Sequence, residues 1–289
     1  MAFSDRKDAR RVKVPGMAQI MFDLKPGRCN SDVYINQKMD VTNLVKYIEK
    51  LNRKEKKYSI FHAFVTAIAK TIYNRPKLNY FVANRHLYEH KEVVISFVAK
   101  VSFEDNSEEV MIMIPIDDKD NIDSISKKIK KKVEYNRSDE LVKEGANSAI
   151  DIIGKFPNLV RVPLMGTLKW LDKKGKLPSG LTKDNLYYSS MIVSNLGSIK
   201  CGAIYHNITN FGTSSGLATF GEIKEVEVIS NKGKKEVKKL CEFGINLDER
   251  IADGYYFAKS INMLQYIFDN PQLLEEEMNN ILDMKELRK

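Results

Sequence analysis

The side chains of this 289-residue chain that could move protons lie in two short segments and one loop. Glu249 stands four residues before Asp253, Ser194 begins the run Ser-Asn-Leu-Gly, and His206 is the histidine nearest to that serine in the sequence. A group that takes a proton from a hydroxyl or a thiol needs a pKa near the working pH, which histidine has without adjustment. A glutamate, with an ordinary pKa of ~4.3, meets this need only when burial raises that value by several units.

Each of these side chains also has an ordinary structural interpretation. A serine at a strand end commonly bonds the backbone, and a lone histidine in a polar loop is more often structural or solvated. Glu249 could simply form a salt bridge, with Arg250 or with a lysine of a neighbouring chain. Among the other histidines, we expect His62 to be packed beside an apolar stripe, and His86 and His90 to be exposed at a hairpin.

The elements that must position these residues are a mixture of strands and helices. Ser59 is predicted to cap a helix that ends before Pro76, because the residue before proline is pushed out of the helical region. Strict alternation of apolar residues over 93–103 predicts a strand with one buried face. The hairpins require antiparallel pairing, so the order of elements predicts an α+β fold, a two-layer sandwich of a mixed, largely antiparallel sheet and helices.

The segments around the candidate residues are predicted in the same way. A long hairpin over 217–247 leads into Glu249, and helices are predicted over 255–268 and 271–287, the second opening with proline. Residues 186–194 are predicted to form the strand that ends in Ser194. Between 139 and 185 an apolar helical run is interrupted by two prolines, and we interpret it as core, as an oligomer contact or as the lining of an apolar substrate channel.

Composition narrows the class of protein. The chain has 47 Lys and Arg against 38 Asp and Glu, a net charge of +9 that weakly favours anionic partners such as a phosphorylated cofactor. Its three cysteines, Cys29, Cys201 and Cys241, show no paired spacing, which argues against a disulfide framework or a zinc site and for a reducing compartment. No window approaches the ~18 apolar residues of a membrane span. We therefore expect a cytoplasmic protein.

The first thirteen residues differ from the rest in character. Residues 1–13 are polar and basic and are predicted to form an arm with a frayed terminus, whereas 14–289 are predicted to form one domain. Nucleic-acid binding through this arm and the lysine-rich helix over 121–137 is disfavoured, because the basic residues lack interleaved aromatic residues. The glycine-rich turns that bind dinucleotides or nucleoside triphosphates are missing from the sequence.

Three segments together resemble the catalytic cores of chloramphenicol acetyltransferases and dihydrolipoyl acyltransferases. Residues 31–80 look like the opening strand and helices of that core, and 191–197 are similar to its Ser-Asn-Leu-Gly strand end. Residues 248–254 are similar to the His-x-x-x-Asp-Gly signature, with Glu249 in place of the histidine. The order and spacing of these segments match from about residue 14 onward.

The resemblance implies an activity and an assembly. The family moves an acyl group between a thioester, usually of coenzyme A, and a hydroxyl or thiol acceptor, without a metal. It forms homotrimers in which the base of one subunit faces the serine and cofactor channel of its neighbour. The chain has no room for the lipoyl domain that usually accompanies such cores, so we expect a stand-alone member.

The resemblance also implies residue roles. Ser194 would donate a hydrogen bond to the oxyanion, and Asp253 would pair with an arginine, for which Arg10, Arg11 and Arg28 are candidates. Three hypotheses stay open for the base: Glu249 with a raised pKa, His206 in its place, or no base at all. In the last case the protein is an inactive homotrimeric pseudoenzyme that binds a ligand or acts as a scaffold.

Overall fold

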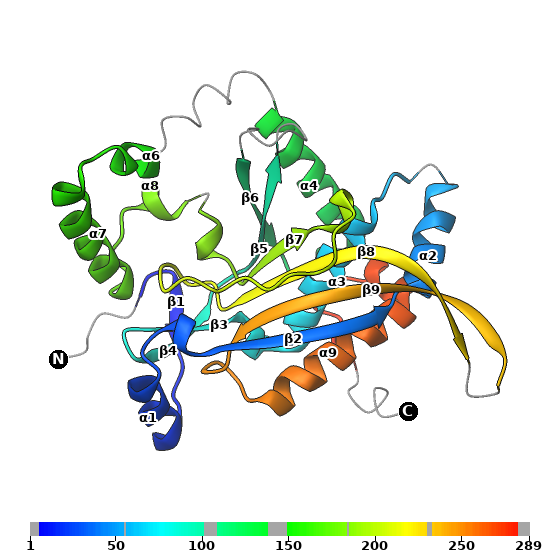
Figure 1. Ribbon diagram of the computed structural model, residues 1–289, viewed down its shortest axis with the longest axis horizontal. Coiled ribbons are helices and arrows are strands. Elements are labelled where there is room, and N and C mark those ends of the chain that lie inside the picture. Colours follow the sequence, from blue (N-terminus) through cyan, green and yellow to red (C-terminus); the bar gives the residue numbers. More distant parts are fainter. Residues whose placement is uncertain are drawn as a thin grey trace.

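The computed structural model of the chain describes residues 6–54, 56–100, 109–137, 149–183, 185–229 and 233–282. These residues form a layer of strands with helices packed against it, as Figure 1 shows. The predicted α+β class with two layers is confirmed.

The larger sheet has six strands in the order β2-β9-β8-β7-β5-β6. They are β2 (Asp32–Asp40), β5 (Val93–Lys100), β6 (Glu109–Ile116), β7 (Met191–Asn195), β8 (Gly216–Ile229) and β9 (Lys235–Asp248). The short strand β7 runs parallel to β5 and β8, and the other neighbours are antiparallel. The strand predicted over 93–103 is confirmed as far as Lys100, and 101–103 lie outside the described residues.

Helices α2 (Thr42–Asn52), α3 (Ile60–Asn74), α4 (Ile122–Arg137) and α9 (Gly254–Asp269) share one apolar core with this sheet. The ring of Phe64 on α3 lies 4.7 Å from that of Phe220 on β8 and 5.2 Å from that of Phe243 on β9. The side chain of Ser59 accepts a hydrogen bond from the backbone N–H of His62, so the predicted cap is present. The core therefore fixes β8 and β9, the two strands that lead to the candidate residues.

A smaller sheet, in the order β1-β4-β3, lies beside the start of β2. Its strands are β1 (Ala9–Arg11), β3 (Tyr80–Ala83) and β4 (His86–His90). Because β1 pairs with β4, the described part of the N-terminal arm is not frayed. His90 is enclosed here, with its ring nitrogens 2.9 Å from the Asn79 carbonyl and 3.0 Å from Thr213 Oγ1, so the prediction that it is exposed is wrong.

Two predicted elements differ from the structure. The helix predicted over 271–287 is only a 3-10 turn, Pro271–Glu275. The backbone N–H of Met278 bonds the Asp120 carbonyl, which takes the chain away from a helical path, and residues 283–287 lie outside the described part. The strand predicted over 186–194 begins instead with a 3-10 turn, Leu186–Tyr188, which Asn185 caps.

Four further helices lie toward the left of Figure 1, and Phe22 of the first of them reaches the main core. They are α1 (Gly16–Leu24), α6 (Ala149–Gly154), α7 (Asn158–Lys173) and α8 (Ser179–Thr182). Pro163 lies inside α7, so it does not interrupt the apolar run as the sequence predicted. Within the described ranges, no helix is both long enough and apolar enough to cross a membrane.

Candidate functional site

The loop after β9 is held by a buried ion pair. Asp248, the last residue of the strand, is fully buried, and the guanidinium of Arg250 grips its two carboxylate oxygens through Nε (2.8 Å) and Nη2 (2.7 Å). Nη1 of Arg250 also donates to the carbonyl oxygen of Lys25 at 3.0 Å. Such a two-point contact between planar groups fixes orientation as well as distance, so the backbone on both sides of Glu249 is anchored.

Glu249 lies between these anchors with its side chain 35% exposed. Its carboxylate forms an ion pair with Lys25, the residue at the C-terminal end of α1, and its backbone N–H donates to the Ser31 carbonyl. A glutamate that acts as a base needs burial that disfavours its charge. Here the carboxylate is partly solvated and lies beside a cation of its own chain.

Asp253 has a different partner from the arginine that the resemblance implies. Its side chain accepts a hydrogen bond from the backbone N–H of Tyr256 at 2.8 Å and so caps α9. Across the described ranges it has no ion pair with an arginine: Arg11 contacts His86, and Arg28 donates weakly to the Thr209 carbonyl. In this loop the pairing of carboxylate and guanidinium falls instead to Asp248 and Arg250.

Ser194 is half-buried on β7 and lies opposite Thr219 of β8, which in turn lies opposite Gly244 of β9. Ile192, two residues before it, joins a cluster with Leu217 outside the main core. Because side chains two apart on a strand share a face, Ser194 points to the sheet face away from the helices.

Among the described residues, no hydrogen bond joins His206 to Ser194. His206 is exposed in a segment that crosses the outer face of the sheet. The segment begins over β8, where Ile204 exchanges hydrogen bonds with Thr219, the residue opposite Ser194. It continues to β2, where Tyr205 packs edge-on against Tyr34 and Asn207 accepts a hydrogen bond from the same tyrosine. His206 therefore lies on the sheet face of Ser194, in the direction of β2.

Ser194 and Glu249 are far apart in one chain. In the register of the sheet, Ser194 is aligned through Thr219 with Gly244 of β9, which lies two strands away. Glu249 follows Gly244 by five residues. Two strand spacings and five residues of extended chain give a separation on the order of 20 Å. A reacting group could contact both side chains only if a second chain supplied one of them.

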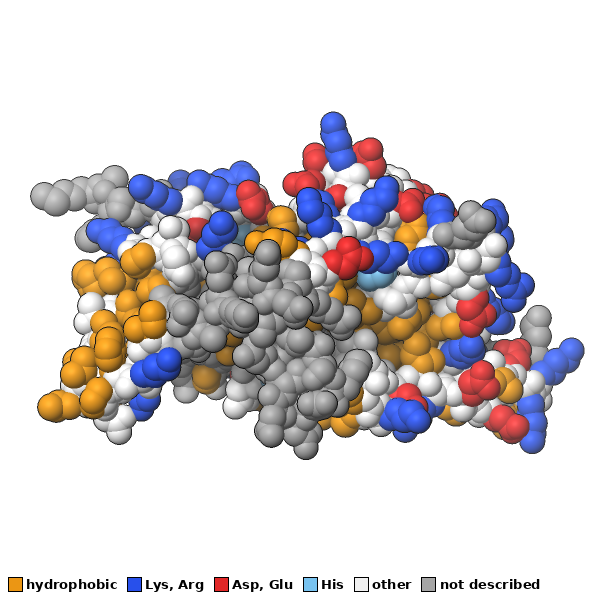
Figure 2. Space-filling model, turned by 90° about the horizontal axis from the view of Figure 1, so that it is seen from above, with side chains coloured by type: hydrophobic (Ala, Val, Ile, Leu, Met, Phe, Trp, Pro, Cys, Tyr) orange, Lys and Arg blue, Asp and Glu red, His pale blue; other side chains and the backbone are white. Residues whose placement is uncertain are grey.

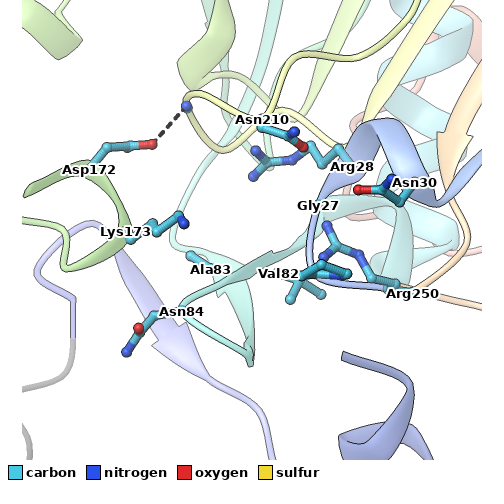
Figure 3. A pocket seen from close by; sticks show the side chains of 12 residues that line it. Gly27, Arg28, Asn30, Val82, Ala83, Asn84, Asp172, Lys173, Asn210 and Arg250 are labelled. Atoms are coloured by element: carbon cyan, nitrogen blue, oxygen red, sulfur yellow. Dashed lines mark hydrogen bonds between the residues drawn. The ribbon is translucent and has the colours of Figure 1, made fainter. Parts of the chain in front are cut away.

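A cavity of about 240 Å³ opens beside the Arg250 loop and is shown in Figure 3. Arg28, Arg250 and Lys173 line it, together with the side-chain amides of Asn30, from the same turn as Arg28, and of Asn84 and Asn210, from two further segments. Asp172 also lines it, but its carboxylate accepts hydrogen bonds from Gly212 N–H (3.0 Å) and Tyr188 Oη (2.6 Å). Cationic groups therefore dominate the lining.

Arg28 gives this cavity its chemical character. Its side chain is 3% exposed, and its Nε and Nη2 have no hydrogen-bond partner in the part of the chain that the structure describes. Burial lowers the pKa of this guanidinium, although Asp248 nearby opposes the effect. On Arg6 and Arg250 the same edge, Nε and Nη2, holds a carboxylate, so an oxyanion is the partner that the Arg28 edge would take.

Comparison with known proteins decides the family. The sequence profile described as "2-oxoacid dehydrogenases acyltransferase (catalytic domain)" matches residues 7–156 and 164–275. This chain belongs to the 2-oxoacid dehydrogenase acyltransferase family. No curated protein sequence matches it significantly.

Solved acyltransferase structures share the fold. A probable dihydrolipoamide acetyltransferase from Listeria monocytogenes is 17% identical, with a TM-score of 0.59 over 90% of this chain and 94% of that one. The truncated 2-oxoacid dehydrogenase complex core from Thermoplasma acidophilum is 17% identical, with a TM-score of 0.56 over 90% and 98%. A chloramphenicol acetyltransferase is 9% identical, with a TM-score of 0.53 over 90% and 99%. Both branches of the resemblance stated from the sequence are thus confirmed at the level of fold.

The family profile leaves one internal segment of this chain unmatched. Residues 157–163, which the family profile does not match, include the first turns of α7. The sequence did not predict the cationic cavity, because its lining comes from separate segments. Arg28 was considered in the sequence only as a candidate partner for Asp253. Among the described residues, no group of three or more His, Cys, Asp and Glu could hold a metal ion.

Proposed function

We propose that this acyltransferase-family protein moves an acyl group between a coenzyme A thioester and a hydroxyl or thiol acceptor, at sites formed between the chains of a homotrimer. The observation that carries the proposal is the placement of Ser194 and Glu249. Both side chains are partly exposed, yet they lie too far apart in one chain to act on one substrate. The shared fold with dihydrolipoamide and chloramphenicol acetyltransferases supports the reaction class.

In this proposal each residue has a stated task. The hydroxyl of Ser194 donates a hydrogen bond to the oxyanion of the tetrahedral intermediate. Glu249 of the neighbouring chain receives the acceptor proton after its ion pair with Lys25 opens, and Asp253 holds the loop by capping α9. When the tetrahedral intermediate collapses, the bond to the coenzyme A sulfur breaks, and the departing thiolate takes up that proton. The cavity lined by Arg28 and Arg250 offers a place for an anionic group, such as the phosphates of coenzyme A.

A second candidate is a homotrimer without catalytic activity that binds a ligand or serves as a scaffold. The ion pair between Glu249 and Lys25 favours it, because a carboxylate held by a cation of its own chain is a poor proton acceptor. In that case the cationic cavity would still bind an anion.

Release of coenzyme A from a panel of acyl-CoAs distinguishes the two, with dihydrolipoamide as the thiol acceptor and chloramphenicol as the hydroxyl acceptor. Coenzyme A itself is quantified by chromatography, because transfer to a thiol acceptor consumes one thiol for each thiol released. We expect release from the native protein, and a loss of about 100-fold or more in Glu249→Gln, the usual lower range for removal of a general base. His206→Ala and the exposed control Glu236→Gln should keep full activity.

Other outcomes would change the assignment. Loss in His206→Ala with activity kept in Glu249→Gln would make the histidine the base. No release from the native protein, together with activity created by Glu249→His, would establish the inactive alternative.

A further inference from the structure

The outward face of α7 is apolar. Leu159 is 89% exposed, Val162 65% and Trp170 57%, and with Gly166 they recur at the spacing of one helical face. A Cβ atom placed on Gly166 would meet nothing within 4 Å, so this face is open. The buried residues of the helix, Leu168 among them, lie on the other side.

Neighbouring side chains extend this face into a patch. Ile152 of α6 (50%), Phe156 (40%) and Val160 (50%) are also exposed. Figure 2 shows hydrophobic side chains gathered at the left end of the molecule, where α7 lies in Figure 1. Exposed apolar residues are ordinary when scattered, whereas a contiguous patch marks a contact surface.

The charge around the patch is mainly positive. Residues 149–184, which span α6 to α8, contain seven Lys and Arg against three acidic residues, and one of these, Asp172, is buried and hydrogen-bonded. In the whole chain the two signs are far closer, at 47 to 38. Lys155 and Lys169 are exposed beside the apolar side chains, so a partner for this surface must accept apolar groups at its centre and cations at its rim.

We propose that α7 and the adjoining end of α6 dock on the surface of a membrane that contains anionic lipids. A helix lying in the plane of such an interface buries its apolar face at the boundary between headgroups and acyl chains, while its lysines reach lipid phosphates. Trp170 lies where an indole ring is favoured, at the level of the headgroups.

A symmetric contact of this face with its own copy would bring two cationic rims together, since an isologous interface pairs each patch with itself. In the proposed homotrimer the contacts are heterologous, so the face would have to meet a different surface of the next chain. The net charge of +9 makes that chain a poorer match for a cationic rim than anionic lipid. The inference does not depend on the proposed acyl transfer, because it uses neither Ser194 nor Glu249.

Trp170 is the only tryptophan in the sequence, so its fluorescence reports directly on the environment of α7. We would measure tryptophan emission and co-sedimentation with vesicles of phosphatidylcholine, with and without phosphatidylglycerol. The expected result is a blue shift and co-sedimentation with the phosphatidylglycerol vesicles, both weakened by salt. Leu159→Glu and Val162→Glu, on an open surface, should each lower the apparent affinity roughly tenfold, and Lys169→Glu should lower it as well.

The exposed Ile229 of β8, 76% exposed, supplies a matched control in Ile229→Glu, which should bind vesicles like the native protein. Failure to bind, or equal binding to vesicles without phosphatidylglycerol, would overturn the proposal. A blue shift that grows with protein concentration in the absence of vesicles would also overturn it and would assign the face to a second copy. So would an equal loss of binding in the Ile229→Glu control.

Discussion

Arg28 and Arg250 are both buried against the same cavity, yet their surroundings differ. Arg250 has the carboxylate of Asp248, which is itself fully buried. Arg28 has no carboxylate partner within the described ranges, and part of its guanidinium makes no hydrogen bond. Burial of a charge is costly unless the charge is paired. The two arginines should therefore contribute unequally to the stability of the protein without a bound ligand.

Replacement of each by methionine tests this difference. Arg250→Met should lower the free energy of unfolding by about 3–5 kcal/mol, because it leaves Asp248 buried without a partner. Arg28→Met should cost much less or stabilise the free protein, since it removes a buried charge that lacks one. Urea denaturation measures both, and equal losses would show that Arg28 has a partner of its own.

At the start of helix α9, a motif residue has a different structural role from the one that the resemblance implies. The resemblance assigns Asp253 to an ion pair, whereas here its carboxylate caps the helix through the Tyr256 N–H. Capping needs only a side-chain oxygen, which asparagine also has, whereas an ion pair needs the charge.

The two roles therefore predict different losses of stability when Asp253 is replaced. Asp253→Ala should lower the free energy of unfolding by about 1 kcal/mol, and Asp253→Asn by only a few tenths. Thermal or urea unfolding of both variants is the measurement. If the asparagine variant were as unstable as the alanine variant, the charge of Asp253 would matter and the capping account would fail.

Most helices and strands could be predicted from the sequence, because apolar periodicity and helix caps depend on residues that are close together in the chain. Ser59 and Pro76 bound α3 as predicted, and the long hairpin became β8 and β9. Tertiary contacts decided the rest: backbone bonds to the loop before α4 replaced the predicted final helix. The cavity around Arg28 could not be foreseen, since distant segments meet there only after folding.

At the scale of the whole molecule, the buried His62 and the half-buried His90 link stability to pH. Burial lowers the pKa of both His62 and His90 to about 4, against ~6.5 in an unfolded chain. Between these values the unfolded chain binds more protons than the folded one, so the stability that the neutral rings contribute is present above pH ~6.5 and is lost as the pH falls toward ~4.

Urea denaturation at about pH 7 and about pH 5 should therefore show lower stability at the acidic value. His62→Gln should flatten part of this dependence while keeping the capping box at the start of α3, where glutamine also serves. His206→Gln, at an exposed position, is the control and should leave the profile unchanged. A profile equally steep in His62→Gln and the native protein would contradict the assignment to His62.

The central claim is that Ser194 and Glu249 act together only across two chains. Ser194→Ala and Glu249→Gln homotrimers should each lose the acceptor-dependent release of coenzyme A from acyl-CoA, whereas trimers formed by co-expression of the two variants should regain it. In a random mixture about one quarter of the sites pair an intact serine with an intact glutamate of the neighbouring chain. Recovery near that fraction is the predicted result, and mixed trimers as inactive as their parents would contradict the account.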